Sequence, residues 1–251
     1  MKLTGIMALA NTEGYAPSPK HASDVSLEEL ALQARLLQGL LLMKLYDAPL
    51  APNPRRVRIF LAEKGIEVPR VEIDIVGGEN LGADFLAINP RGLLPTLVLD
   101  DGTTIDESVA ISRYFEELQP DPPLMGTDPR SRALVGRWQR LVEFDGGIPV
   151  AEAFRNSAPN YADRAVAGRT GDPAIPELAA RGRARLQAFY DQLDTRLTDV
   201  RYIAGGGFTI ADITALCIID FARAIKLGYG ESRPHLARWH TEVRERPSSR
   251  A

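Results

Sequence analysis

Three residues near the middle of the chain have side chains that can bind the charged groups of a small ligand. Asp106, Glu107 and Ser108 directly precede a helix-like segment at residues 109–118. Acidic and hydroxyl side chains in this position are typical of helix caps. A helix start also attracts anions, because its first backbone N–H groups lack partners. The three residues therefore predict either a capped helix or a polar ligand site.

A turn that ends at Leu94-Pro95 lies at the other end of the same hairpin. An apolar strand, 96–99, runs into an Asp-Asp-Gly turn at 100–102, and a short second strand covers 103–105. Asp-Gly between two β-favouring runs predicts a hairpin, because Gly accepts positive φ. The turn and the helix start can hold a small peptide-like ligand between exposed backbone groups and a helix N-terminus. An ordinary hairpin followed by a helix explains the same residues, and both interpretations stay open at this point.

The overall composition argues against two classes of partner. The 251 residues carry a formal net charge of −3, and the isoelectric point is about 5.7, whereas a dedicated nucleic-acid binder is usually basic. The apolar-rich run 36–46 is too short to cross a membrane. We therefore expect neither a nucleic-acid nor a membrane partner. The length allows one large domain or two small ones.

The cysteine and histidine content predicts no metal site. Cys217 is the single cysteine, and His21, His235 and His240 are scattered without zinc-ligand spacing. A single cysteine cannot form an intramolecular disulfide. A reducing, cytoplasmic setting is the simpler inference.

Residues 43–119 predict an α/β unit that positions the hairpin. The elements expected ahead of the hairpin are a strand, a helix, a strand and an irregular or weakly helical segment, at residues 44–47, 54–64, 68–75 and 77–85. Three prolines within 48–54 exclude regular structure there, so the helix is expected to begin at Pro54. The order is β-α-β-α-β-β-α, with the first two strands parallel and the last two antiparallel.

A proline-rich linker, residues 120–129, separates this unit from a segment without strand signals. Residues 130–251 predict an all-helical domain with a loop at 160–173. Its expected helices cover residues 130–144, 176–197, 210–224 and 234–246. Gly146 to Pro149 is expected to interrupt the first helix, and Thr209 with Asp212 forms a capping box before the third.

Residues 1–42 predict an N-terminal extension. Its first part, to about residue 24, has no apolar period and reads as a flexible arm. Ser26 and Glu29 then have the spacing of a capping box ahead of an amphipathic helix that reaches about residue 42. That helix packs on the body or binds a partner, or the extension results from a start assigned upstream of Met43.

The combination of a βαβαββα unit, a proline-rich linker and an all-helical half resembles the glutathione S-transferase family. Four local sequences carry the resemblance in the right order over about residues 43–251. They are Asn89-Pro90-Arg91-Gly92-Leu93-Leu94-Pro95-Thr96-Leu97, Asp106-Glu107-Ser108-Val109-Ala110-Ile111, Phe208-Thr209-Ile210-Ala211-Asp212-Ile213 and Arg246-Pro247-Ser248. The resemblance implies an α/β thioredoxin-like N-terminal domain and an all-α C-terminal domain.

The family resemblance also implies a glutathione site. Carried over to this sequence, Leu94 pairs its backbone with the cysteinyl part of glutathione, beside a cis bond at Pro95. Glu107 and Ser108 hold the γ-glutamyl group: Glu107 binds the ammonium of that group, and Ser108 binds the carboxylate of that group. Glutathione is thus the expected co-substrate, and Asn53 is expected to contact it near the thiol. The alternative is plain capping by the same residues.

The group that activates the thiol is not defined by the resemblance. The turn at residues 48–54 contains no Ser, Thr or Cys, so Asn53 is its only side-chain donor, and Tyr46 on the first strand is a second candidate. The absence of Cys argues against glutaredoxin-like chemistry. The sequence around this turn most resembles bacterial and fungal transferases similar to the second yeast enzyme, which are thought to use a water held by Ser and His. Here Asn156 takes the His place, with Ser157 beside it.

These observations imply an enzyme that joins the glutathione thiolate to small hydrophobic electrophiles, a detoxification reaction. Aromatic residues of the helical half are the expected pocket lining, namely Trp138, Phe144, Phe154 and Tyr161. The alternatives are a glutathione-binding protein with little catalysis and a glutathione-dependent etherase or dehalogenase. A homodimer is expected from the family.

Overall fold

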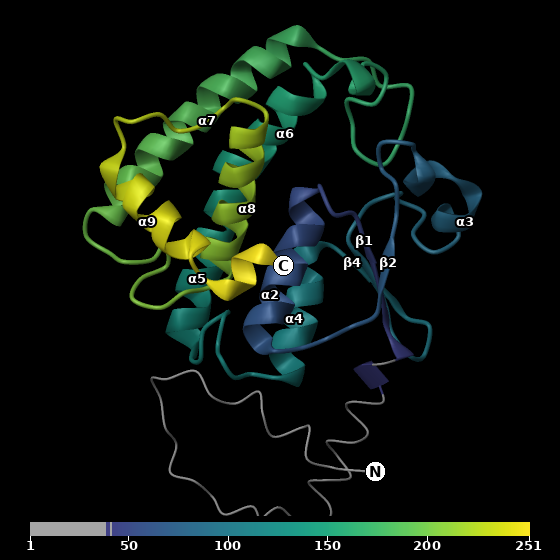
Figure 1. Ribbon diagram of the computed structural model, residues 1–251, viewed down its shortest axis with the longest axis horizontal. Coiled ribbons are helices and arrows are strands. Elements are labelled where there is room, and N and C mark those ends of the chain that lie inside the picture. The colour runs from purple at the N-terminus through teal and green to yellow at the C-terminus, as the bar shows by residue number, and fades with distance from the viewer. Residues whose placement is uncertain (1–38, 41) are drawn as a thin grey trace, which may run out of the picture. The chain divides into compact units, whose positions relative to one another are not determined.

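The computed structural model describes residues 39–40 and 42–251 (Figure 1). The predicted arm and capping box of the N-terminal extension lie outside the described residues. From Leu40 onward the chain forms one compact unit. No helix among the described residues is long and apolar enough to cross a membrane.

A four-stranded mixed sheet forms the first half of this unit. Its strands are β1 (Lys44–Asp47), β2 (Arg70–Glu72), β3 (Thr96–Val98) and β4 (Thr104–Asp106). The spatial order is β2-β1-β3-β4, with β1 and β2 parallel and the two other pairs antiparallel. This is the predicted topology, and β2 is shorter than the strand expected over 68–75.

Helices cover both faces of the sheet. The helices α2 (Pro52–Lys64) and α4 (Ser108–Leu118) lie between the sheet and the helical half, whereas the short η2 (Glu79–Leu81) and α3 (Ala83–Leu86) lie on the other side (Figure 1). Side chains alternate along β1 accordingly. Leu45 is almost fully buried in the main core, and the ring of Tyr46 meets Phe85 of α3 edge-on at 5.8 Å.

The helix α2 begins two residues earlier than predicted. Pro52 is its first residue and Ala51 is the N-cap, so the prolines belong to the first turn instead of preceding it. Proline is tolerated there because the first N–H groups of a helix have no intrahelical acceptor. The shift places Asn53 inside the first turn, which matters for the site described below.

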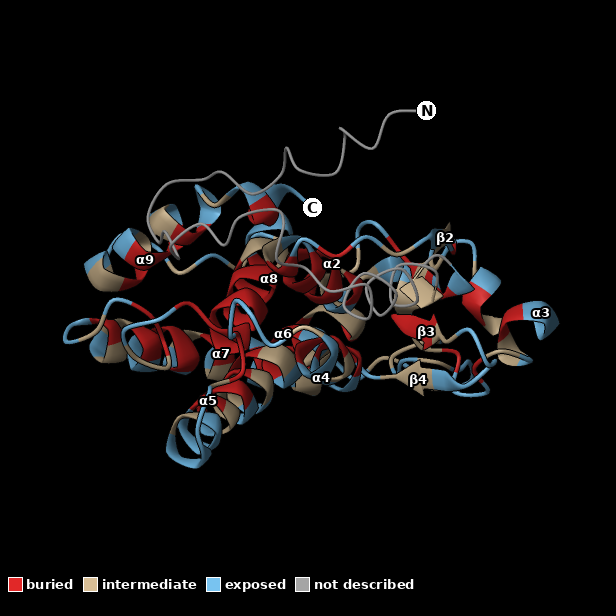
Figure 2. Cartoon of the chain, turned by 90° about the horizontal axis from the view of Figure 1, so that it is seen from below, coloured by how far each residue is buried: buried red, intermediate tan, exposed pale blue. Residues whose placement is uncertain are grey.

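The second half is all-helical. Its elements are α5 (Pro129–Val142), η3 (Glu143–Gly147), α6 (Ile148–Arg155), η4 (Pro159–Tyr161), α7 (Pro176–Leu197), α8 (Ile210–Ala224), α9 (Pro234–Arg244) and η5 (Pro247–Arg250). The helix α8 is central and almost wholly buried (Figure 2). The bounds of α7 and α8 agree with the prediction, and α9 ends two residues early.

The expected interruption at Gly146 to Pro149 is wrong. The chain passes from α5 to α6 through η3, a single π-helical turn, and stays helical throughout. Gly146 serves close packing: a Cβ there would lie 2.6 Å from the ring of Phe189 on α7. Gly182 on α7 serves the same purpose against Pro149 and Ala153. These glycines let α7 approach the α5–α6 helix closely, and they do not end it.

Polar contacts fasten the two halves together. Arg246 donates two hydrogen bonds to Glu63 at the end of α2, at 2.8 and 2.6 Å, and Ser248 donates to the same carboxylate. Arg55 on α2 pairs with Asp220 on α8 at 2.8 Å. The C-terminal Arg-Pro-Ser sequence is therefore an anchor for α2.

Candidate functional site

The start of α4 has the geometry of a ligand site more than that of a cap. Glu107 is the N-cap residue, yet its side chain makes no capping hydrogen bond. Its backbone has φ 67° and ψ 121°, a conformation that non-glycine residues rarely adopt and that concentrates at functional sites. The hydroxyl of the buried Ser108 has no hydrogen bond to another described residue. The plain-capping alternative therefore loses its expected contacts.

Arg91 is a component of this site that sequence reasoning missed. Its Nη1 atom lies 2.8 Å from a carboxylate oxygen of Asp106 and 2.8 Å from one of Glu107. These hydrogen bonds, the one to Glu107 foremost, raise the pKa of the guanidinium above its usual value. Arg91 thus pairs with the Glu107 carboxylate in this structure. A ligand ammonium must therefore share that carboxylate with Arg91 or displace the Arg91 guanidinium. Fifteen residues separate Arg91 from Asp106, and only the hairpin register brings them together.

The turn before β3 leaves backbone groups unpaired among the described residues. The Leu94–Pro95 bond is cis, as the resemblance implied. The β1–β3 ladder ends at the pair Tyr46–Thr96, and the backbone groups of Leu94 make no hydrogen bond within the described chain. An extended peptide can add to such a free edge through main-chain hydrogen bonds. Buried Asn89 fixes the turn by donating to the Leu93 carbonyl at 3.1 Å and to Thr96 Oγ1 at 2.9 Å.

A loop of the helical half, residues 159–175, packs against this turn. Arg164 Nη2 donates to the Ile75 carbonyl at 2.8 Å, which joins the loop to the segment after β2. Gly168 lies against the backbone of Arg91 so tightly that a Cβ would be 2.1 Å from the Arg91 carbonyl oxygen. The loop therefore supports the backbone from which Arg91 reaches Glu107.

Gly168→Ala is expected to disturb the turn, and Gly171→Ala is its matched control. Both glycines have positive φ, +81° and +85°, so each alanine adds a similar backbone strain of roughly 1–2 kcal/mol. Only Gly168 faces Arg91, since a Cβ at Gly171 meets nothing within 4 Å. The Michaelis constant for the ligand of this site should rise in Gly168→Ala alone. Equal constants in the two variants would mean that the loop does not support the turn.

The first turn of α2 offers a small set of donors. Pro52 and Pro54 have no N–H, and the Arg55 N–H is bound to the Ala51 carbonyl at 3.3 Å. The Asn53 N–H and its exposed side-chain amide, which has no hydrogen bond to a described residue, are therefore the donors that remain. The positive end of the helix dipole lies at the same place. An anion at this helix start can be stabilised by Asn53.

Tyr46 and Ser157 lie in surroundings that differ from those of Asn53. Tyr46 is half-buried and packs on Phe85, on the face of the sheet away from α2. Ser157 follows α6 and donates to the Ala153 carbonyl at 2.6 Å. Its neighbour Asn156 accepts from the Ile175 N–H at 2.8 Å, which joins the end of α6 to the start of α7. No hydrogen bond between described residues links Asn156 or Ser157 to the thioredoxin-like half.

The single cysteine is a poor nucleophile. Cys217 on α8 is buried, and burial raises the pKa of its thiol to about 11. Nearby Arg56 lies between α2 and η3, with Nη1 3.4 Å from Glu143, and its own pKa is lowered by burial. Cys217 remains protonated at neutral pH, so thiol chemistry at this site needs a thiol from the ligand.

Three apolar side chains are exposed, in the turn before α2 and at the junction of η3 with α6. Leu50, in the turn before α2, is 87% exposed, and Phe144 and Ile148 are 45% and 41% exposed one turn apart on η3 and α6. Of the predicted lining residues, Trp138 is buried, whereas Phe154 and Tyr161 pack together at 4.9 Å. Phe144 is therefore the predicted lining residue that is most open to solvent.

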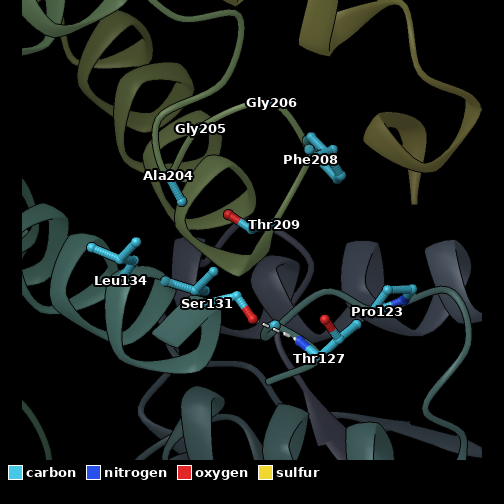
Figure 3. A pocket seen from close by; sticks show the side chains of 12 residues that line it. Pro123, Thr127, Ser131, Leu134, Ala204, Gly205, Gly206, Phe208 and Thr209 are labelled. Carbon is cyan, nitrogen blue, oxygen red and sulfur yellow. Dashed lines mark hydrogen bonds between the residues drawn. The ribbon is translucent and has the colours of Figure 1, made fainter. Parts of the chain in front are cut away.

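A hollow elsewhere in the helical half is unrelated to these groups. It is lined by the linker, the start of α5 and the loop before α8 (Figure 3). Two of its polar lining residues are hydrogen-bonded to each other, since Ser131 Oγ accepts from the Thr127 N–H at 3.0 Å. None of the site residues predicted from the sequence lines this hollow.

A thioredoxin-like half with an open cis-proline turn, joined to an all-helical half, defines a class of glutathione-dependent proteins. Two family models match the chain: "Glutathione S-transferase, N-terminal domain" over residues 51–118 and "Glutathione S-transferase, C-terminal domain" over residues 161–247. The chain belongs to the glutathione S-transferase family, whose members use glutathione as a substrate.

The relatives agree with the predicted subgroup. The chain is 34% identical over 208 residues to glutathione S-transferase 2 of Saccharomyces cerevisiae, covering 82% of this chain and 87% of that protein. The crystal structure of Gtt2 from Saccharomyces cerevisiae aligns with a TM-score of 0.77 at 33% identity, over 82% of this chain and 98% of that one. A class Gtt2 enzyme of Vibrio parahaemolyticus aligns at 0.69 and 37% identity, over 82% and 94%.

Proposed function

We propose that this protein is a glutathione S-transferase that joins the glutathione thiolate to small hydrophobic electrophiles. The observation that carries the proposal is Glu107, whose positive φ at an uncapped helix start is strained without a structural benefit. The strain would be offset by two contacts: a ligand carboxylate bound to the free N–H groups of α4, and a ligand ammonium bound to Glu107. The γ-glutamyl end of glutathione carries both groups.

The rest of glutathione fits the same line of contacts. Its cysteinyl backbone would pair with the free groups of Leu94 beside Pro95, as an added strand does. The thiol then points toward the first turn of α2. There Asn53 donates to the thiolate, and the hydrogen bond lowers the pKa of the thiol by favouring its charged form.

Asn53 is the activating residue that we favour. Its donors are free, whereas the hydroxyl of Ser157 is engaged within its own helix end. Tyr46 and Ser157 remain secondary proposals: Tyr46 as a direct donor and Ser157 as the holder of a water. Leu50, Phe144 and Ile148 supply the apolar surface for the electrophile.

Turnover separates this proposal from its main alternative. The assay measures conjugation of a chlorodinitrobenzene-type electrophile with glutathione against the uncatalysed rate, and thermal unfolding with and without glutathione. A transferase gives both acceleration and stabilisation, because a ligand that binds the native state raises its stability. Stabilisation without acceleration across several electrophiles, including ether and halide substrates, would indicate a binding protein. Ether or halide cleavage alone would indicate an etherase or dehalogenase.

Variants of the α4 start test the binding residues directly. Ser108→Ala should raise the glutathione dissociation constant about tenfold, and Glu107→Gln by roughly 10- to 100-fold, since a charge-assisted bond contributes about 1.5–3 kcal/mol. Ser112→Ala is the matched control, because Ser112 lies one turn further and donates to the Ser108 carbonyl at 2.8 Å. An unchanged constant in Ser108→Ala would remove the site from this helix start.

We also propose a cytoplasmic homodimer that takes part in detoxification. Dimerisation is common among symmetric soluble assemblies, and the one buried cysteine suits a reducing compartment. Sedimentation of the full chain measures the assembly state.

A further inference from the structure

A second, polar hollow lies in the helical half, and none of the candidate glutathione-site residues lines it. It measures about 430 Å³ and is lined by α8, α9 and the C-terminal residues. Its lining consists of three arginines, a histidine, two hydroxyl residues and one glutamate, namely Arg223, Arg244, Arg250, His240, Tyr229, Thr241 and Glu245. The volume lies within the range of small-molecule sites. Positive charge thus exceeds negative charge around the hollow.

The centre of the hollow is a buried imidazole. His240 is 2% exposed, and its Nε2 lies 2.8 Å from Asp220 Oδ1. Its Nδ1 lies 3.2 Å from the Tyr229 hydroxyl and 3.4 Å from Arg223 Nη1. These partners assign the neutral tautomer, with Nε2–H donating to Asp220 and Nδ1 accepting from the two lining residues.

Two of the three arginines of the hollow make no ion pair with a carboxylate of the described chain. Arg223 contacts His240 and makes no ion pair with a described residue, and Arg250 makes none either. Arg244 lies 3.7 Å from Asp220, which already binds His240 and Arg55. Three guanidinium groups that line one hollow, two of them without a carboxylate partner among the described residues, are a fitting site for an anion with several oxygens.

We propose that this hollow binds a phosphate monoester. A phosphate presents three oxygens to the Arg223, Arg244 and Arg250 guanidiniums, and the Thr241 hydroxyl supplies a further donor. Glu245, which also lines the hollow, accepts from hydroxyl groups of the organic part, which favours a sugar-type phosphate over a bare ion. The His240 ring on which the hollow is built is fixed in place, because Asp220 binds His240 through one oxygen and Arg55 of α2 through the other.

Phosphate-dependent stabilisation of the full chain tests the proposal. Thermal unfolding is measured against inorganic phosphate, and against glucose 6-phosphate as a sugar phosphate, at constant ionic strength set with sodium chloride. We expect a saturable rise of the midpoint with both probes. The dissociation constant for each should rise at least tenfold in the double variant Arg223→Gln, Arg250→Gln. Both side chains lie on the surface, and the midpoint without phosphate verifies that the variant folds.

Two control variants make the result specific. Arg130→Gln removes an exposed arginine on α5 and should leave the phosphate response unchanged. Ser108→Ala should also leave it unchanged, which separates this hollow from the anion-binding helix start of α4. A non-saturable response, or the same response in the double variant and the original chain, would overturn the proposal. A response lost in Ser108→Ala would do so too.

Discussion

Asp212→Ala is expected to lower the free energy of unfolding by at least about 3 kcal/mol. Asp212 is fully buried, and its two oxygens accept from the Ile203 N–H at 2.9 Å, the Trp239 Nε1–H at 2.9 Å and the Thr209 N–H at 3.0 Å. Alanine leaves all three donors buried without an acceptor, and each unsatisfied group costs roughly 1–3 kcal/mol. Urea denaturation measures the loss through the midpoint.

The chain contains its own control for this experiment. Asp128 caps α5 in the same way, with Oδ1 accepting from the Arg130 and Ser131 N–H groups at 2.9 and 3.1 Å, but it is exposed. Water can replace those bonds, so Asp128→Ala should cause only a small loss. Asp212→Asn keeps one acceptor oxygen and should fall between the two. Equal midpoints for Asp128→Ala and Asp212→Ala would mean that burial does not set the cost of losing this cap.

The same comparison explains why the sequence predicted parts of the fold well. Thr209 and Asp212 have capping-box spacing ahead of an apolar run, and α8 begins at the predicted residue. Pro176 and a regular apolar period likewise define α7. Local signals of this kind involve residues three or four apart, so they can be read without knowing the fold.

Features that depend on distant contacts could not be predicted. Gly146 resembles a helix breaker in the sequence, and only the approach of α7 to the α5–α6 helix explains it. Arg91 likewise meets Glu107 only after the hairpin has formed. The sequence therefore indicated Glu107 as a candidate binding residue, but it did not indicate the ion pair of Glu107 with Arg91.

The candidate site also has one part that local sequence predicts and one part that depends on distant contacts. Leu94, Pro95, Glu107 and Ser108 lie within one stretch of the chain, and their positions follow from the hairpin and the helix after it. The candidate groups for thiol activation come from β1, α2 and the end of α6, which the sequence alone cannot align. The free donors of Asn53 became apparent only once α2 was seen to begin at Pro52.

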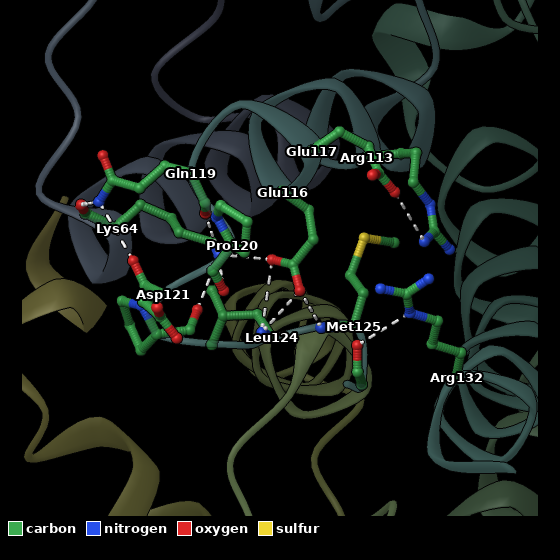
Figure 4. A network of polar contacts seen from close by, with 12 residues as sticks. Lys64, Arg113, Glu116, Glu117, Gln119, Pro120, Asp121, Leu124, Met125 and Arg132 are labelled. Carbon is green, nitrogen blue, oxygen red and sulfur yellow. Dashed lines mark hydrogen bonds and ion pairs between the residues drawn. The ribbon is translucent and has the colours of Figure 1, made fainter. Parts of the chain in front are cut away.

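Lys64→Met is expected to destabilise the protein by roughly 3–5 kcal/mol, because it breaks a buried ion pair by removing one partner. The Lys64 side chain is fully buried, and its ammonium lies 2.6 Å from Glu116 Oε2 (Figure 4). It also donates to the carbonyls of Gln119 and Pro122, both at 2.7 Å. Methionine has a similar volume but leaves the carboxylate without its counter-charge and these carbonyls without this donor.

The ammonium holds three parts of the chain at one point, since Lys64 ends α2, Glu116 belongs to α4 and the carbonyls belong to the linker. Lys64→Met should also loosen the linker between the halves, because the bonds to the Pro120 and Pro122 carbonyls are lost. The loosening should be partial, because Glu116 retains its bonds from the Leu124 and Met125 N–H groups, at 3.0 and 2.8 Å. Lys44→Met, at an exposed lysine of β1, is the control. Adding Glu116→Gln to Lys64→Met should recover part of the loss, because the uncompensated charge is then gone. Additive losses in that double variant would show that the two groups do not act as a pair.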